Sequence, residues 1–279
     1  MKHVVVSPHF DDAIGSCGAT ISRLRRHDEE VVVQTIFGGT PSPPYSEFAL
    51  RLHAVWGSAD FPVPTRLEED KRACAVLGCA QGSLGILEGL YRNSAEGAHL
   101  YPDEPSLFGP IASEDHDLHV VTSRELAGGA AISDLCFYVP LGVGHHVDHV
   151  IAFRMGLEWA RLGYSVWFYR DFFYTDWDCP HFGGHWGRAL VQRLPAIDLE
   201  QKVKAFLHYR SQIRMLFGDA ASAVSYFAGA NPRRGRSHFQ EVLWQLDRIS
   251  PDAGSRKVFS PGAVHRDSRA DQPSKLRTA

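Results

Sequence analysis

The chain has 279 residues, of which 44% are apolar and 22% charged, and its formal net charge is −3. This composition is typical of a globular protein with one large domain, and the small net charge gives no general affinity for nucleic acids. No apolar run approaches the ~18–20 residues of a membrane span, and the N-terminus lacks the pattern of a signal peptide. The five cysteines form no CxxC pair, which argues against a disulfide framework or a zinc ribbon and favours a reducing, cytoplasmic compartment.

Strand-like and helix-like segments alternate along most of the chain. In chain order we expect a strand at 4–7, a helix at 13–26, a strand at 31–37, helices at 46–56 and 66–77, strands at 83–87 and 132–139, a helix at 147–162, a strand at 166–169 and helices at 202–217 and 240–249. The continuous β-branched run at 31–37 is typical of a central parallel strand. The alternation predicts an α/β fold, a Rossmann-like three-layer sandwich with a mostly parallel central sheet.

Residues 1–249 are expected to form this single domain. From Ser250 onward the chain is polar and rich in proline, serine and arginine, which predicts a disordered tail over 250–279. The irregular segments 38–64 and 93–129 are long enough to shape a substrate pocket. The sequence is compatible with a homo-oligomer but does not determine the oligomeric state.

Ionisable residues cluster directly after two of the expected strands. Ser7–Asp12 follows the first strand, and His145–His149 follows the fourth. An open α/β sheet binds its ligands at the carboxyl ends of its strands. Catalytic zinc typically has three protein ligands and an open position for water, and His9, Asp12 and His149 could supply two nitrogens and one oxygen. Fe²⁺ is also compatible with this ligand set.

A metal ion at this position would make the site hydrolytic, because it lowers the pKa of bound water to ~7 and polarises a carbonyl. Asp11 lies between two of the expected ligands and is the candidate general base. A protonated imidazole such as His146 would help to stabilise the oxyanion, and Asp148 would hold that imidazole charged and oriented. Asp11 or Asp12 alone would more often be a helix N-cap, and Asp148 could cap the helix at 147–162, so the prediction depends on the two clusters together.

The two clusters resemble the motifs of the PIG-L/LmbE-type zinc deacetylases. Residues 8–13 (PHFDDA) are similar to the first family motif, HPDDE, and residues 146–149 (HVDH) are similar to the second, HPDH or HVDH. Phe10 replaces the usual proline and Ala13 the usual glutamate. The resemblance implies that His9, Asp12 and His149 bind zinc, that Asp11 is the general base and that His146 assists at the oxyanion.

The resemblance extends over residues 1–245 through weaker segments. Arg66 and Glu69 fit a family R-x-x-E pattern, residues 88–92 (EGLYR) resemble D-A-x-Y-R, and residues 169–174 (YRDFFY) resemble Y-E-D-x-P-Y. In some family members the arginine of the first pattern faces the substrate. We therefore expect substrate contacts from four residues: Arg66, Glu88, Arg92 and Asp171.

These observations predict a zinc-dependent N-deacetylase that removes an acetyl or other acyl group from an N-acylated amino sugar or glycoconjugate, in natural-product biosynthesis. An amidase that cleaves a larger thiol- or acyl-conjugate amide with the same site is an alternative. A non-catalytic sugar-binding module with a bound metal also stays open. A nucleotide-binding protein is a distant alternative, because residues 15–18 (GSCG) lack the G-x-G-x-x-G pattern and Asp11 and Asp12 would repel phosphate.

Overall fold

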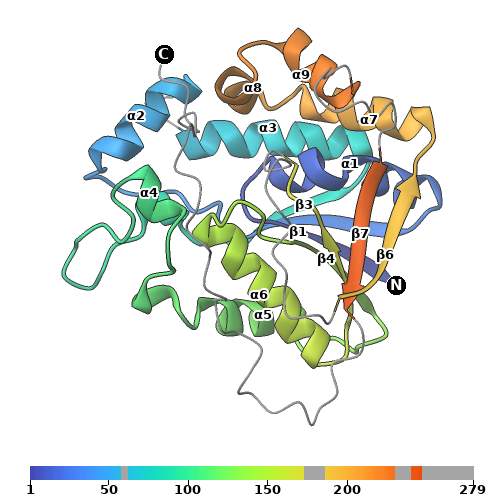
Figure 1. The fold of residues 1–279 in the computed structure, drawn as a ribbon, viewed down its shortest axis with the longest axis horizontal. Helices are drawn as coiled ribbons and strands as arrows, with labels where there is room; N and C mark the ends of the chain where they lie inside the picture. The colour runs from blue at the N-terminus through green and yellow to red at the C-terminus, as the bar shows by residue number, and fades with distance from the viewer. Residues whose placement is uncertain (58–61, 173–185, 230–239, 247–279) are drawn as a thin grey trace, which may run out of the picture.

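A computed structural model describes residues 1–57, 62–172, 186–229 and 240–246 (Figure 1). Its strands are β1 (Lys2–Ser7), β2 (Glu30–Thr35), β3 (Ala80–Ser83), β4 (Leu135–Pro140), β5 (Ser165–Tyr169), β6 (Trp186–Arg193) and β7 (Gln240–Leu246). Within the described ranges they form one seven-stranded sheet in the order β3-β2-β1-β4-β5-β7-β6. Strands β1 to β5 pair in parallel, whereas β7 is antiparallel to both β5 and β6.

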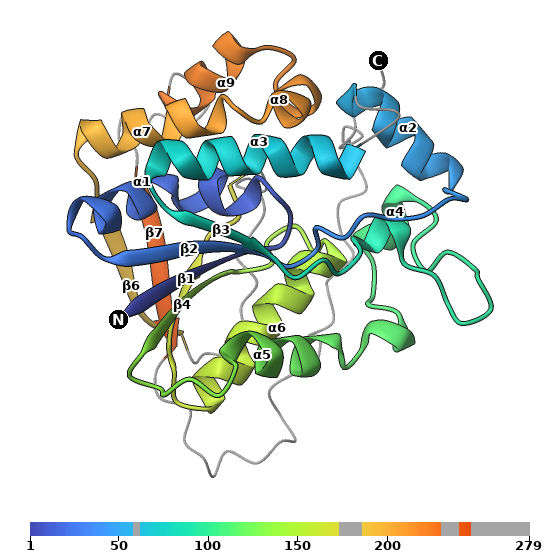
Figure 2. The ribbon, with the colours of Figure 1, turned by 180° about the vertical axis from the view of Figure 1, so that it is seen from behind.

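Helices cover both faces of this sheet and give the fold three layers, as the opposite views in Figures 1 and 2 show. Helices α1 (Asp12–Arg26), α3 (Pro62–Leu77) and α7 (Ala196–Phe206) lie on one face, and α5 (Leu118–Ala127) and α6 (Val147–Arg161) lie on the other. The other helices are α2 (Glu47–Trp56), α4 (Glu104–Leu107), α8 (Arg210–Leu216) and α9 (Ala220–Phe227), with 3₁₀ turns at Gly89–Tyr91 and Ser113–Asp115. None of the described helices is long and apolar enough to cross a membrane. The predicted α/β fold with a mostly parallel sheet is confirmed.

The central strands are buried on both faces. Successive side chains of a strand point to opposite sides, so Val5 packs into the core beneath α1, whereas Val4 and Val6 pack into the core beneath α6. All six residues of β4 are buried, and the Phe137 ring stacks on Trp159 of α6 with 3.9 Å between centroids. This double burial explains the continuous apolar runs in the sequence, and it holds the carboxyl ends of β1 and β4 rigidly side by side.

Three predicted elements are wrong. The helix expected at 240–249 is strand β7, because β5 and β6 offer backbone partners on both sides and Leu243 is buried between the layers. The strand expected at 83–87 is β3, which ends at Ser83. The single helix expected at 202–217 is divided into α7 and α8, since Tyr209 leaves helical geometry and donates a hydrogen bond to Asp70.

Helices α4, α5 and α9 and strand β6 were not predicted. The expected tail at 250–279 lies outside the described residues, as do the last three residues of the expected domain. Residues 15–18, which were considered as a phosphate loop, lie inside helix α1. A helix interior has no free backbone N–H groups to cradle a phosphate, so the structure gives the nucleotide-binding alternative no support.

Helix α1 is broken at Cys17, which has non-helical angles of φ −131° and ψ 27°. Two residues from distant elements bind the backbone groups that the break leaves without helical partners. Lys202 of α7 donates to the carbonyl of Ser16 at 3.1 Å, and the Glu241 carboxylate of β7 accepts from the backbone N–H of Thr20 at 2.7 Å. Lys202 and Glu241 also form an ion pair at 2.8 Å. The first turn of α1 is therefore fixed separately from the rest of the helix.

Candidate active site

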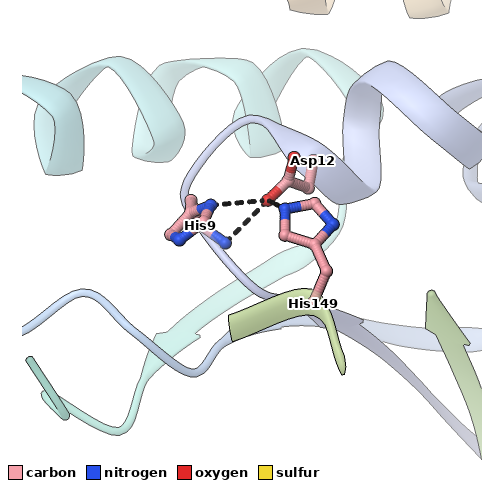
Figure 3. A group of neighbouring side chains, drawn as sticks. All are labelled: His9, Asp12 and His149. Atoms are coloured by element: carbon pink, nitrogen blue, oxygen red, sulfur yellow. Dashed lines mark hydrogen bonds and ion pairs between the residues drawn. The ribbon is translucent and has the colours of Figure 1, made fainter. Parts of the chain in front are cut away.

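The carboxyl ends of β1 and β4 lie next to each other, and the residues that follow them meet at one point. The structure brings together the three expected metal ligands, His9, Asp12 and His149 (Figure 3). His9 Nδ1 lies 3.1 Å from Asp12 Oδ2, and His149 Nε2 lies 3.2 Å from the same oxygen. Two imidazole nitrogens and one carboxylate oxygen in one small volume are a donor set that suits catalytic zinc.

The turn after β1 is locked by short-range contacts. The Ser7 hydroxyl donates to the carbonyl of His9 and accepts from the backbone N–H of Ala13. Phe10, which replaces the family proline, is buried, and a Cβ atom at Gly38 would lie 2.7 Å from its ring. The glycine at position 38 therefore makes room for the larger side chain, and the turn keeps its shape.

The second ring nitrogen of each histidine ligand contacts a buried carboxylate. His9 Nε2 lies 3.0 Å from Asp148 Oδ2, and His149 Nδ1 lies 2.5 Å from Asp171 Oδ1. Asp171 is fixed in turn, because its other oxygen accepts from the backbone N–H of Val143 at 3.0 Å. Such contacts place the proton on the remote nitrogen and leave the lone pair of the facing nitrogen for a metal.

Asp148 differs from the expectation that it orients His146. The two residues are two positions apart at the start of α6, and side chains at this spacing do not face each other on a helix. The carboxylate of Asp148 contacts His9, and its hydrogen bond to His146 comes from the backbone N–H, which donates to Nδ1 at 3.2 Å. His146 is thus the N-cap of α6, while His149, three positions on, lies on the same face as His146.

The paired groups shift one another's pKa values. Burial alone would raise the pKa of Asp12, but the His149 and His9 side chains hold it well below its usual range. Burial is also outweighed at His149, where Asp12 and Asp171 raise the pKa well above its usual range. A metal ion must therefore displace protons from this cluster, so its binding is expected to weaken at low pH.

Asp11 occupies the N-cap position of α1 but makes no capping hydrogen bond with its side chain. Its carboxylate faces Arg66, whose Nη2 lies 3.5 Å away, while Arg66 Nη1 donates to Glu88 at 2.6 Å. The guanidinium stacks on the Trp56 ring, 4.7 Å from the centroid. Burial and the neighbouring Asp12 raise the pKa of Asp11 to about 6, against the opposing charge of Arg66. This value is close to what proton transfer at neutral pH needs.

A cavity of about 140 Å³ opens onto these groups. Its polar side is formed by His9, Asp11, Asp12, Arg66, Glu88, Glu104, His146, His149 and Gln212, and its apolar side by Phe48, Leu52, Trp56, Leu90, Leu107, Phe108, Phe172, Met215 and Leu216. Of the four expected substrate contacts, Arg66 and Glu88 line this cavity, whereas Arg92 and Asp171 lie behind the ligands and contact Asp148 and His149.

The apolar side of the cavity was missed in the sequence. It comes from α2, α4 and α8, which approach one another only in the folded chain. One signal was readable, because Phe48, Leu52 and Trp56 repeat every four residues and form a stripe on α2. No comparable pattern marks Leu107 and Phe108, which lie in the irregular segment 93–129.

Comparisons with known proteins agree with this geometry. The family model described as PIG-L: GlcNAc-PI de-N-acetylase matches residues 4–160, more than half of the chain. A 2'-N-acetylparomamine deacetylase from Niallia circulans is 28% identical over 264 residues, which cover 88% of this chain and 95% of that protein. The zinc-inhibited form of teicoplanin deacetylase Orf2 has a TM-score of 0.77 at 24% identity, over 91% of this chain and 100% of its own. The A40926 pseudoaglycone deacetylase Dbv21 has a TM-score of 0.70 at 25% identity, over 89% and 98%. The chain therefore belongs to the PIG-L family and is an N-deacetylase.

Proposed function

We propose that this protein is a zinc-dependent hydrolase that removes an acetyl or larger acyl group from the amine of an amino sugar or glycoconjugate. The observation that carries the proposal is the convergence of His9 Nδ1, Asp12 Oδ2 and His149 Nε2. Beside them lies the carboxylate of Asp11, which makes no capping hydrogen bond to helix α1. Relatives whose names refer to paromamine, teicoplanin and the A40926 pseudoaglycone support an amino-sugar substrate from natural-product biosynthesis.

Zinc held by His9, Asp12 and His149 would supply a water of lowered pKa and a Lewis acid for the amide carbonyl. Asp11 accepts the proton of the attacking water and then delivers it to the departing amine. Arg66 holds the Asp11 carboxylate at the cavity surface through a contact at 3.5 Å. The C–N bond of the amide breaks, and the products are a carboxylate and a free amine.

His146 stabilises the developing oxyanion with its Nε2–H. Its Nδ1 accepts from the backbone N–H of Asp148, so the proton of the neutral ring lies on Nε2. Burial and the nearby His9 lower the pKa of His146 well below its usual range, which favours this neutral ring. The edge-on ring of Phe108, 5.3 Å between centroids, limits rotation of the imidazole. A neutral donor thus takes the place of the charged imidazole expected from the sequence.

The apolar side of the cavity bears on the second candidate, an amidase for a larger acyl group. Phe48 and Leu52 from α2 and Met215 from α8 offer no hydrogen bonds to sugar hydroxyls, but they would bury a chain or ring that is apolar. This favours a substrate with apolar surface close to the scissile amide, either in the acyl group or in the aglycone.

The test is a release assay on the zinc-loaded protein. N-acetylated aminoglycosides, N-acetylated glycopeptides and N-acetylglucosamine are compared with the same amino sugars carrying octanoyl or decanoyl groups. Release of acetate from at least one sugar supports the deacetylase, and faster release of the long acyl groups favours the amidase. A protein that binds one zinc ion per chain and cleaves none of these amides contradicts both.

A further inference from the structure

We propose that Arg92, Asp115 and Tyr101 form a buried relay that positions the metal ligand His9 and thereby strengthens zinc binding. The inference rests on the proposed metal site but not on the identity of the substrate. It gives Arg92 a different task from the substrate contact expected for it from the sequence. It also gives a task to the irregular segment 93–129, which contributes two of the three residues.

The relay begins at Asp148, which is fully buried. Its Oδ2 contacts His9 Nε2 at 3.0 Å and accepts from the backbone N–H of Gly89 at 2.9 Å. Its Oδ1 forms an ion pair with Arg92 Nη1 at 2.7 Å. Both oxygens are therefore fixed, and the plane of the carboxylate determines where the His9 ring can point.

Arg92 is held from several directions. Its Nε donates to Asp115 Oδ2 at 2.8 Å, and its Nη1 donates to the carbonyl of Leu87 at 2.9 Å. The guanidinium lies over the rings of Phe37 and Tyr101, 5.1 and 5.4 Å from their centroids. A buried arginine needs a carboxylate to pair with its charge, and here Arg92 forms ion pairs with both Asp115 and Asp148. Its Nη2 is buried without a hydrogen-bond partner among the described residues, and Arg92 has no place in the cavity lining.

Tyr101 completes the relay at its outer end. Its hydroxyl donates to Asp115 Oδ2 at 2.7 Å and accepts from the backbone N–H of Ala112 at 2.9 Å. Tyr101, Asp115, Arg92 and Asp148 are 1%, 5%, 8% and 0% exposed, so the part of the relay behind His9 is shielded from water. A chain of five side chains thus connects the segment 93–129 to the metal ligand: Tyr101, Asp115, Arg92, Asp148 and His9.

The physical consequence concerns the orientation of one ring. His9 binds a metal only if Nδ1 faces Asp12, and this requires Nε2 to stay on Asp148. Removing a group that supports a ligand histidine typically costs 10–100-fold in metal affinity. Arg92 and Asp115 act through one further contact, so we expect losses toward the lower end of that range.

The test measures zinc affinity, which needs no substrate. The dissociation constant of zinc is determined by competition with a chromophoric chelator for the full chain and for three variants: Arg92→Met, Asp115→Asn and Tyr101→Phe. We expect zinc binding to weaken about tenfold in the first two and about threefold in Tyr101→Phe. Arg92→Lys, which restores the charge, is expected to recover part of the loss.

Tyr138→Phe is the matched control, because it removes another buried hydroxyl, which is 3.1 Å from His3 Nδ1 at the opposite end of β1. The thermal unfolding midpoint of the zinc-free variants shows whether each remains folded, and the visible spectrum of the Co²⁺-loaded protein reports the ligand geometry. A zinc dissociation constant within twofold of the unmodified chain in both Arg92→Met and Asp115→Asn overturns the relay. Zinc binding that weakens equally in Tyr138→Phe also overturns the relay.

If Arg92→Met does not fold, the zinc dissociation constants of Asp115→Asn and Tyr101→Phe decide by the same twofold criterion. An unmodified chain that binds no zinc contradicts the metal site itself.

Discussion

Asp70 of α3 should make the stability of the protein depend on pH in a direction opposite to that of most carboxylates. It is fully buried and accepts a hydrogen bond from the Tyr209 hydroxyl at 2.6 Å. Burial raises its pKa from 3.8 to about 7. Below pH 3.8 the carboxyl is protonated in both the folded and the unfolded chain, and the two states do not differ.

Between pH 3.8 and about 7 the folded chain retains a proton at Asp70 that the unfolded chain releases. The free energy of unfolding therefore falls as pH rises through this interval, and above pH 7 the loss is complete. An interval of about 3 pK units corresponds to about 4 kcal/mol. Asn at this position keeps the oxygen that accepts from Tyr209 but cannot lose a proton.

We predict that Asp70→Asn becomes progressively more stable than the unmodified chain as pH rises from 4 to 8. Urea unfolding at several pH values in this range gives the difference in the free energy of unfolding. Asp198→Asn is the matched comparison: hydrogen bonds from Arg26 and Ser22 outweigh burial there and lower the pKa. The stability that Asp198 contributes is present above its unfolded pKa of 3.8 and is lost only as pH falls below it, so the effect of Asp198→Asn should stay nearly constant from pH 4 to 8. A difference between Asp70→Asn and the unmodified chain that is constant from pH 4 to 8 would refute the argument.

Three further predictions concern catalysis, packing and substrate choice. Asp11→Asn should keep zinc but lower kcat by about 10²–10⁴-fold, as measured by acetate release; near-normal turnover would exclude Asp11 as the base. Gly156→Ala should lower the free energy of unfolding by about 1–3 kcal/mol, because its Cβ would lie 2.5 Å from Val139; a thermal midpoint equal to that of the unmodified chain would contradict this. Leu216→Gln should lower kcat/KM more for substrates with long acyl chains than for acetylated ones, and an equal loss for both would argue against an apolar subsite.

The fold class and the meeting of the two clusters could be predicted from the sequence because both depend on local patterns. Continuous β-branched runs mark central strands, and residues after adjacent parallel strands necessarily meet at one edge of the sheet. Strand β7 could not be predicted in this way. The segment 240–246 has no period of two, and its state is decided by the exposed edges of β5 and β6 between which it pairs.

The partners of buried charges could not be predicted from closeness in the sequence. Asp148 is two residues from His146, yet it contacts His9, which is 139 positions away. Arg92 belongs to the segment 88–92, whose resemblance to a family pattern indicated a functional role. Its partners Asp115 and Asp148 lie on other elements and are brought to it by folding. Hence the three candidate metal ligands could be proposed from the sequence, whereas the groups that contact them required the structure.

The break in α1 links the candidate ligand Asp12 to the order in which the chain is synthesised. Lys202 binds the end of the segment that starts with Asp12, and it is held in turn by Glu241 of the last described strand, which also caps the second half of the helix. A growing chain on the ribosome carries His9 and Asp12 almost from the beginning, but it lacks the carboxylate that caps the second half of α1 until residue 241 has emerged. Helix α1 is therefore completed only after residue 241 has emerged, and a chain cut before residue 240 would lose this support although it retains His9, Asp12 and His149.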